Sequence, residues 1–376
     1  MVHILLTGAA GYIGGTILAD LLARQDGPVK AARLFAAVRT QEQVELLSKL
    51  AGVSVAQVDL LRKDAVEDYV HRNEIDFIVN LAPSFDLIVV SNLLGALGKR
   101  RQDGANDLRL VNSSVTAAFS KENGWPFGEI SDTGPVIAKE REIGDQHPVR
   151  VVRLKILQTN VDPPKANIEA RQTSWLLKRG RNWESRRILS SSQTCVNGRG
   201  TGQGRKQSVS IPTYVRVSIR NQIVNKFDQD GHPAAAHVTD LAALYVLLIE
   251  KILQGDPIPS DEVGIYFGVA YTMSWWKVMS AIARALHSRG LVKDLEPQFW
   301  PSYDTAADEL GWPRAYIRGM GASSPQLIPR NADKIGWKPE WDESRFMESI
   351  DDEVQDALDL DTGTTSLYDS VQASKS

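Results

Sequence analysis

Three glycines near the start of the chain have a spacing that could bind a phosphate group. Gly8, Gly11 and Gly14 follow the apolar run 4–6 and lead into residues 17–23, whose apolar side chains recur at helical spacing. Glycine lets the backbone turn tightly and lets a ligand approach the main chain. The unpaired N–H groups at the start of the following helix attract a phosphate. This order of strand, glycine loop and helix predicts a dinucleotide-binding βαβ unit, with a purely structural turn as the alternative.

Alternating strands and helices are predicted for the first third of the chain. From the apolar spacing we expect strands at residues 34–38, 53–58, 75–79 and 108–111, and helices at 63–72 and 86–101. Repeated βα units form a parallel sheet with helices on both faces, and ligands bind at the carboxyl ends of its strands. We therefore expect an α/β protein with a Rossmann-like, doubly wound parallel sheet and a smaller, mostly helical C-terminal substrate subdomain.

Residues at the ends of the predicted strands are candidates for the rest of the dinucleotide site. Arg39 follows the second strand, where an arginine suits the 2′-phosphate of NADP and a carboxylate would suit NAD. NADP is therefore the preferred cofactor and NAD the alternative. Asp59 and Leu60 end the third strand, where a side chain can contact the adenine, and residues 81–83 leave room beside the nicotinamide. The predicted cofactor-binding residues are Thr7, Gly8, Gly11, Tyr12, Ile13, Gly14, Arg39, Asp59, Leu60, Leu81, Ala82 and Pro83.

The composition is that of a globular protein with room for a large core. The 376 residues are 43% hydrophobic and 24% charged. The single cysteine, Cys195, excludes a disulfide framework and a cysteine-built metal site, and it fits a reducing compartment. The first strand is expected to begin at residue 2, and no apolar run approaches the length of a bilayer span. We therefore expect a cytoplasmic protein without a targeting segment or membrane partner.

Taken together, these motifs resemble the extended (atypical) short-chain dehydrogenase/reductase superfamily. More narrowly, the chain is similar to the fungal type of its NAD-dependent epimerase/dehydratase branch, several members of which belong to secondary metabolism. The resemblance rests on residues 7–14, 59–60, 80–82, 111–114, 198–202, 210–212, 236–242 and 336–341. It implies an enzyme that acts on a hydroxyl or carbonyl group of a small metabolite, and it is compatible with a homodimer.

The resemblance also implies a catalytic serine, tyrosine and lysine. In such a site the tyrosine transfers a proton, the lysine four residues later lowers the tyrosine pKa, and the serine hydrogen-bonds the reacting oxygen. Ser114 follows the predicted fifth strand in the matching position, with Ser113 as the alternative. No tyrosine of this chain has a lysine four residues later, and none lies between residues 70 and 213. The expected proton-transfer pair is therefore missing.

The helix expected to carry that pair, around residues 134–141, has Ile137 and Arg141 at the relevant spacing. Lys139 on the same helix is a candidate for contacting the cofactor ribose, although a solvated lysine is the simpler interpretation. The residues that could replace the tyrosine, none of which the spacing singles out, are Glu129, Asp132, Glu140, Tyr214 and His237.

Two hypotheses about function follow from these residues. In the first, the protein is an NAD(P)-dependent oxidoreductase or epimerase/dehydratase-like enzyme with a degraded Ser-Tyr-Lys site and a small-molecule substrate. In the second, it is a non-catalytic NADP(H)-binding sensor or accessory protein.

Residues 150–206 differ in composition from the rest of the chain. They contain 13 lysines and arginines against three acidic residues, so the remainder of the chain carries a net charge of −13. No strand-like apolar run occurs in 153–197, so a central strand of the sheet is expected to be missing. The segment is an arginine-rich loop with Trp175 and Trp183 as stacking platforms, a divergent surface insertion, or the product of a shifted reading frame or mis-spliced exon. We favour the third interpretation and expect no nucleic-acid partner, because no nucleic-acid-binding fold is visible.

The chain is therefore expected to divide into four parts. They are a dinucleotide-binding domain at 1–149, the anomalous basic segment at 150–206, the rest of the fold with the substrate subdomain at 207–358, and a disordered tail at 359–376. Six of the nine tryptophans follow residue 270. We expect them to pack a helical subdomain against the sheet rather than to line an aromatic pocket.

Overall fold

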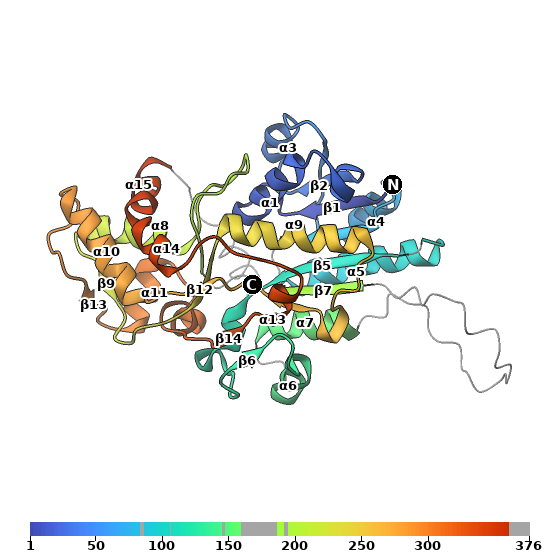
Figure 1. Cartoon of the computed structure of the whole chain (residues 1–376). Helices are drawn as coiled ribbons and strands as arrows, with labels where there is room; N and C mark the ends of the chain where they lie inside the picture. The colour runs from blue at the N-terminus through green and yellow to red at the C-terminus, as the bar shows by residue number, and fades with distance from the viewer. Residues whose placement is uncertain (83–85, 106, 145–146, 159–185, 192–194, 361–376) are drawn as a thin grey trace.

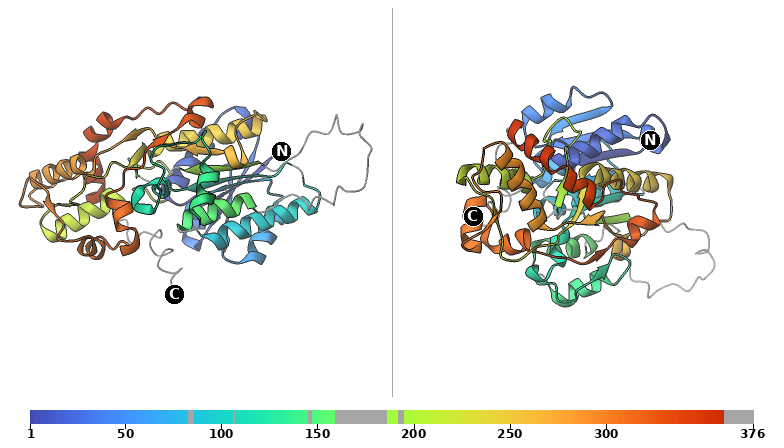
Figure 2. Two further views of the ribbon diagram at one scale, coloured as in Figure 1. Left: turned by 90° about the horizontal axis from the view of Figure 1, so that it is seen from below. Right: turned by 60° about the vertical axis from the view of Figure 1, so that its left-hand side comes forward.

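A parallel sheet with helices on both faces forms the centre of the molecule, and a second, mostly helical part lies beyond one end of the sheet (Figures 1 and 2). The structure is a computed structural model that describes residues 1–82, 86–105, 107–144, 147–158, 186–191 and 195–360.

The central sheet contains seven strands in the order β11-β7-β5-β4-β1-β2-β3, and all of its neighbouring pairs are parallel. Its strands are β1 (His3–Thr7), β2 (Arg33–Val38), β3 (Val53–Gln57), β4 (Phe77–Asn80), β5 (Arg109–Ser114), β7 (Arg186–Ser191) and β11 (Ile265–Phe267). The chain runs outward from β1 in one direction and then returns to build the other half. This confirms the expected Rossmann-like, doubly wound topology.

Apolar side chains on both faces explain why the inner strands form. Residues Ile4 to Leu6 of β1 and Phe77 to Val79 of β4 are at most 1% exposed. Near-continuous apolar runs of this kind are typical of strands covered on both faces. The strands predicted from the sequence are confirmed to within a few residues.

Different helices cover the two faces of the sheet. One face carries α1 (Tyr12–Ala23) and α9 (Val238–Gln254), which pack against each other. The other carries α4 (Lys63–Arg72), α5 (Leu87–Gln102), α6 (Val136–Ile143) and α7 (Pro148–Gln158). The short helices α2 (Gly27–Lys30) and α3 (Gln41–Leu47) flank β2 in the chain.

The expectation that a central strand is missing is wrong. Residues Arg186–Ser191 form β7, which pairs in parallel with β5 along its whole length and with β11 on its other side. A strand between two neighbours forms backbone hydrogen bonds on both edges, so a polar sequence can be accommodated there. Trp175 and Trp183 lie outside the described residues.

The second part of the molecule has its own apolar core. Its helices are α8 (Ser210–Asn221), α10 (Trp275–Ser288), α11 (Tyr303–Leu310), α12 (Ile317–Gly321), α14 (Glu343–Glu348) and α15 (Ile350–Asp359). The remaining described helix, α13 (Arg330–Lys334), belongs to the core of the central sheet. The four 3₁₀ turns of the described chain are η1 (Thr116–Phe119), η2 (Lys121–Asn123), η3 (Asp261–Val263) and η4 (Arg314–Tyr316). Trp275, Trp300 and Trp312 are buried in this core, so they have a packing role, but they pack within the second part and not against the central sheet as expected.

Three short sheets join distant segments. They are β12 (Tyr271–Thr272) with β10 (Ala234–His237) and β8 (Cys195–Asn197), β13 (Gln298–Phe299) with β9 (Asn225–Lys226), and β14 (Leu327–Ile328) with β6 (Ile130–Ser131). Among the described helices, none combines the length and apolar character needed to cross a bilayer.

Candidate functional site

Two of the three loop glycines are required by close backbone packing. Gly8 has φ +71°, and a Cβ there would lie 2.7 Å from the Leu81 carbonyl carbon. A Cβ on Gly14 would lie 2.2 Å from the Gly8 oxygen. Gly11 donates its N–H to the same oxygen at 2.9 Å. These contacts hold the loop against the first turn of α1 and against the chain that leaves β4.

Gly11 is different, because a Cβ placed on it would face only the Gly8 oxygen among the described residues that are not its neighbours in the chain. A Cβ on Gly11 would meet that oxygen at 3.0 Å and no other described atom within 4 Å. Helix α1 begins at the next residue, Tyr12, with no side-chain cap among the described residues and no acidic residue in its first turn. The first N–H groups of a helix have no partner within it, so those of Tyr12 and Ile13 can bind an anion. The residues present fit a dinucleotide phosphate.

The end of β4 is held beside this loop by buried hydrogen bonds. The Thr7 hydroxyl donates to Asn80 Oδ1 at 2.6 Å, and it accepts from the N–H groups of Leu81 at 3.1 Å and Ala82 at 3.2 Å. Asn80 in turn donates to Asn112 Oδ1 on β5 at 2.7 Å. Thr7, Asn80 and Asn112 are fully buried. Thr7 therefore positions the loops around the site. The predicted residue Pro83 lies outside the described residues.

The candidate residues after β2 and β3 lie at the same edge of the sheet. Arg39 is exposed, and no carboxylate of the described residues pairs with its guanidinium. Its backbone is fixed by Gln43, whose Oε1 accepts from the Arg39 N–H at 2.9 Å, and by Gln57, which donates to the Arg39 carbonyl at 3.0 Å. Asp59 accepts from the Leu61 N–H at 3.0 Å. The carbonyl of Leu60 accepts from Asn92 at 2.9 Å.

Ser113 and Ser114 are the last two residues of β5, rather than part of a loop after the strand. Both are at most 1% exposed. Successive side chains of a strand point to opposite faces. Ser114 Oγ accepts a hydrogen bond from Arg153 Nη1 of α7 at 2.7 Å. Ser113 Oγ has no partner among the described residues.

A buried ion pair holds Arg153 in place. Arg153 Nε lies 3.0 Å and 3.1 Å from the two carboxylate oxygens of Glu140, and both side chains are fully buried. The guanidinium lies over the Phe119 ring at 4.6 Å from its centroid. Arg150, one turn earlier on α7 and also fully buried, donates to the carbonyls of Ala118 and Asn123 at 2.8 Å. Glu140 therefore balances a buried charge and is not a free proton acceptor.

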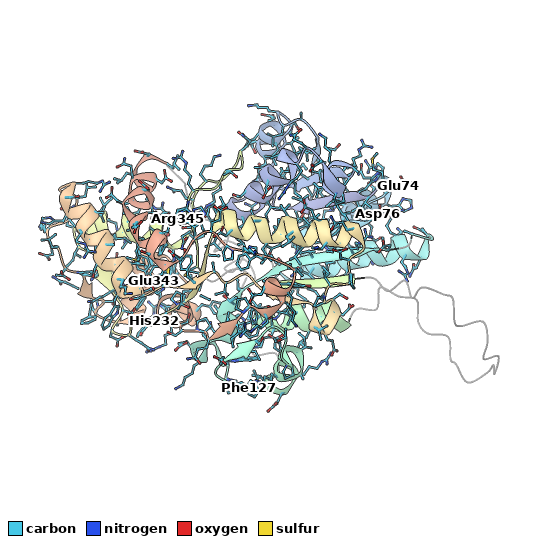
Figure 3. All side chains as sticks on the ribbon, in the orientation of Figure 1. Glu74, Asp76, Phe127, His232, Glu343 and Arg345 are labelled. Carbon is cyan, nitrogen blue, oxygen red and sulfur yellow. The ribbon has the colours of Figure 1, made fainter. Side chains whose placement is uncertain are left out.

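The cation beside Ser114 comes from a different helix than the one expected to carry the tyrosine–lysine pair. Lys139 lies on α6 with its ammonium over the Phe127 ring at 4.9 Å (Figure 3 labels Phe127). The cation that reaches Ser114 is Arg153 on α7, and the residue four positions before it is Val149. A valine cannot transfer a proton, so the expected acid/base group is also missing from this helix. The sequence does carry a signal for α7, namely an apolar run with arginines at helical spacing. The domain boundary that we expected at residue 150 cut through this run.

Three of the other candidates for the missing tyrosine have structural contacts of their own. Asp132 accepts from the N–H groups of Phe267 at 3.1 Å and Asn331 at 2.9 Å, and burial raises its pKa to about 6. His237 stacks on Trp341 at a centroid distance of 3.8 Å, and burial lowers its pKa to about 4. Figure 3 labels Arg345, whose guanidinium also lies over Trp341, at 4.2 Å. The remaining two are Tyr214, which packs between tryptophan rings, and Glu129, which is exposed.

Comparison with known proteins supports the glycine-loop assignment. Residues 4–93, about a quarter of the chain, match the model of the NAD dependent epimerase/dehydratase family. No curated protein sequence gives a significant match.

Several solved structures share the fold over almost the whole chain. A UDP-glucose 4-epimerase from Thermotoga maritima, solved with UDP-glucose, is 14% identical with a TM-score of 0.60, over 95% of this chain and 100% of that one. A dTDP-glucose 4,6-dehydratase from Bacillus anthracis, in complex with NAD, is 13% identical with a TM-score of 0.59, over 94% and 96% of the two chains. A UDP-glucose 4-epimerase from Thermus thermophilus, also with NAD, is 16% identical with a TM-score of 0.56, over 94% and 99%. These likenesses confirm the Rossmann-like fold.

Proposed function

We propose that the protein is an NADP(H)-dependent enzyme of the extended short-chain dehydrogenase/reductase type, in its epimerase/dehydratase-like branch. It acts on a hydroxyl or carbonyl group of a small metabolite. The observation that carries this proposal is the glycine loop, in which Gly11 leaves open the space in front of the uncapped first turn of α1. The match of residues 4–93 to the family model supports it.

Each part of the site has a proposed role. The first-turn N–H groups of α1 bind the pyrophosphate, and Arg39 binds the 2′-phosphate. When bound, the nicotinamide supplies or accepts a hydride. Because Ser114 Oγ accepts from Arg153, the serine hydroxyl hydrogen is left to donate to a substrate oxygen. The fixed positive charge of Arg153 strengthens that donation.

Similarity to other proteins supports the proposed substrate class and cellular role. The ligands of the similar structures include UDP-glucose, so sugar nucleotides are the first substrates to test, followed by small ketones. The resemblance of residues 336–341 to fungal proteins supports a role in secondary metabolism. The single cysteine, Cys195, supports the cytoplasm as the location, and a homodimer completes the proposal.

A non-catalytic NADP(H) sensor is the second candidate function. The lack of a tyrosine four residues before Arg153, the cation that contacts Ser114, favours it, because Val149 stands at that position. Consumption of NADPH with a ketone, or conversion of a sugar nucleotide by the protein loaded with NADP(H) or NAD(H), supports the enzyme. Binding without turnover, in a chain whose transcript is verified across residues 150–200, leaves the sensor.

Gly11→Ala is expected to weaken NADPH binding at least about tenfold, a loss of ~1.4 kcal/mol. The added methyl group would occupy the space where the pyrophosphate approaches. Titration of NADPH fluorescence measures the effect. The control is Gly95→Ala on α5, where a Cβ would meet no described atom within 4 Å. Unchanged NADPH affinity in Gly11→Ala would count against the proposed phosphate site.

Arg39→Ser is expected to weaken NADPH binding about 10- to 100-fold and to leave NADH binding unchanged, because a hydrogen bond to a charged group contributes about 1.5–3 kcal/mol. Parallel titrations with the two dinucleotides measure the difference. Tighter binding of NADH than of NADPH by the unaltered protein would reverse the assigned preference.

A further inference from the structure

Residues 198–206, here called the glycine strap, lie directly against the glycine loop. A Cβ on Gly202 would lie 2.3 Å from the Gly15 carbonyl carbon, and one on Gly204 would lie 2.0 Å from the Ala10 oxygen. The N–H of Arg205 donates to that same Ala10 oxygen at 3.1 Å. In Figure 1 the strap is the yellow-green loop beside α1. Only glycine permits this approach, so the sequence is built for contact between the strap and the proposed phosphate site.

The strap begins at Gly198, whose backbone is held from two sides. The carbonyl of Gly198 accepts a hydrogen bond from the Tyr12 hydroxyl at 2.6 Å, and its N–H donates to the Glu353 carboxylate. Gly198 has φ +88°, and a Cβ there would lie 1.8 Å from His237 Nε2. The backbone of Gly198 has little freedom to move while Tyr12, Glu353 and His237 stay in place.

The two side chains that hydrogen-bond the backbone of Gly198 belong to different parts of the molecule. Tyr12 is the first residue of α1, and its own N–H is among those proposed to bind the pyrophosphate. Glu353 lies on α15, which packs against α8 and α10 in the core of the second part. A second contact joins the strap to this helix, because Arg199 pairs with Asp356 at 2.7 Å.

We infer that the backbone of Gly198 couples the dinucleotide site to the C-terminal helix α15 through Tyr12 on one side and Glu353 on the other. The inference rests on the proposed function. A dinucleotide bound at the first turn of α1 fixes Tyr12, Tyr12 fixes the strap, and the strap favours docking of α15. Coupling between two sites is reciprocal, so a docked α15 raises dinucleotide affinity by the same factor.

Hydrogen–deuterium exchange of the full chain with and without saturating NADPH tests the coupling. We expect NADPH to slow exchange of the backbone amides of α15. Tyr12→Phe and Glu353→Leu should each remove most of this protection and weaken NADPH binding about 3- to 10-fold, since each removes one hydrogen bond to the backbone of Gly198. The matched controls are Tyr69→Phe on α4 and the exposed Glu348→Leu on α14, which should leave both measurements unchanged.

The outcomes separate the two proposals. If NADPH binds and α15 exchanges at the same rate with and without it, the coupling is overturned while the dinucleotide site stands. Full protection in Tyr12→Phe likewise overturns the coupling, even if Glu353→Leu fails to fold. If neither NADPH nor NADH binds the unaltered protein, the dinucleotide proposal falls and the coupling falls with it.

Discussion

Glu140→Gln is expected to lower the free energy of unfolding by about 3–5 kcal/mol, because it leaves a buried positive charge without its partner. The Arg153 guanidinium is fully buried, and Glu140 is the carboxylate that contacts it. Arg150 is buried nearby and adds a second positive charge. Denaturation in urea, followed by circular dichroism, measures the loss.

Two further variants show whether the charge is responsible. Glu142→Gln changes an exposed carboxylate on the same helix and should alter the free energy of unfolding by less than about 0.5 kcal/mol. The double variant Glu140→Leu with Arg153→Met replaces the pair by apolar side chains and should recover most of the loss. If the double variant is as unstable as Glu140→Gln, packing rather than charge is the cause.

Glu353→Gln is expected to remove a pH dependence of stability of about 3 kcal/mol between pH 4.5 and 7, at 1.36 kcal/mol for each unit of pKa. Burial raises the pKa of Glu353 from its ordinary value of 4.5 to about 7, although the hydrogen bond from Gly198 opposes this. The folded state therefore favours the protonated carboxyl group. The stabilising contribution of the Glu353 carboxyl group is complete below pH 4.5 and is lost as the pH rises through 7.

Thermal unfolding across pH 4.5–8 measures this effect. The wild-type protein should lose stability relative to Glu353→Gln as the pH rises, and the two curves should become parallel above about pH 7. The charged and titratable neighbours of Glu353 are Tyr12, Tyr271, Asp352 and Asp356, and all are retained in the variant. Parallel curves over the whole range would show that the pKa of Glu353 is the same in the folded and unfolded states.

The glycine loop could be predicted from sequence because its determinants are local. Gly8, Gly11 and Gly14 lie within seven residues of one another, and the strand and helix on either side have clear apolar periods. The ends of β2, β3 and β4 could be predicted for the same reason. In each case the residue types, the turn and the neighbouring element are adjacent in the chain.

The site at the end of β5 depends on contacts that no local pattern reveals. Arg153 resembles a surface arginine in the sequence, and only its pairing with Glu140, 13 residues earlier, and with Ser114, 39 residues earlier, makes its burial favourable. Strand β7 was missed because its pairing with β5 and β11 outweighs its polar sequence. The contact of Glu353 with Gly198 spans 155 residues.

The hydrogen bonds among Thr7, Asn80 and Asn112 constrain how cofactor preference could be re-engineered. Each of these side chains is a donor or acceptor for the next, across three neighbouring strands. Changing one alone leaves a buried polar group without its partner, which costs about 1–3 kcal/mol, so a mutational library should vary the three positions jointly or leave them fixed. Arg39 lies outside this group and is exposed. Selection for a different dinucleotide can therefore begin at Arg39 without disturbing the sheet.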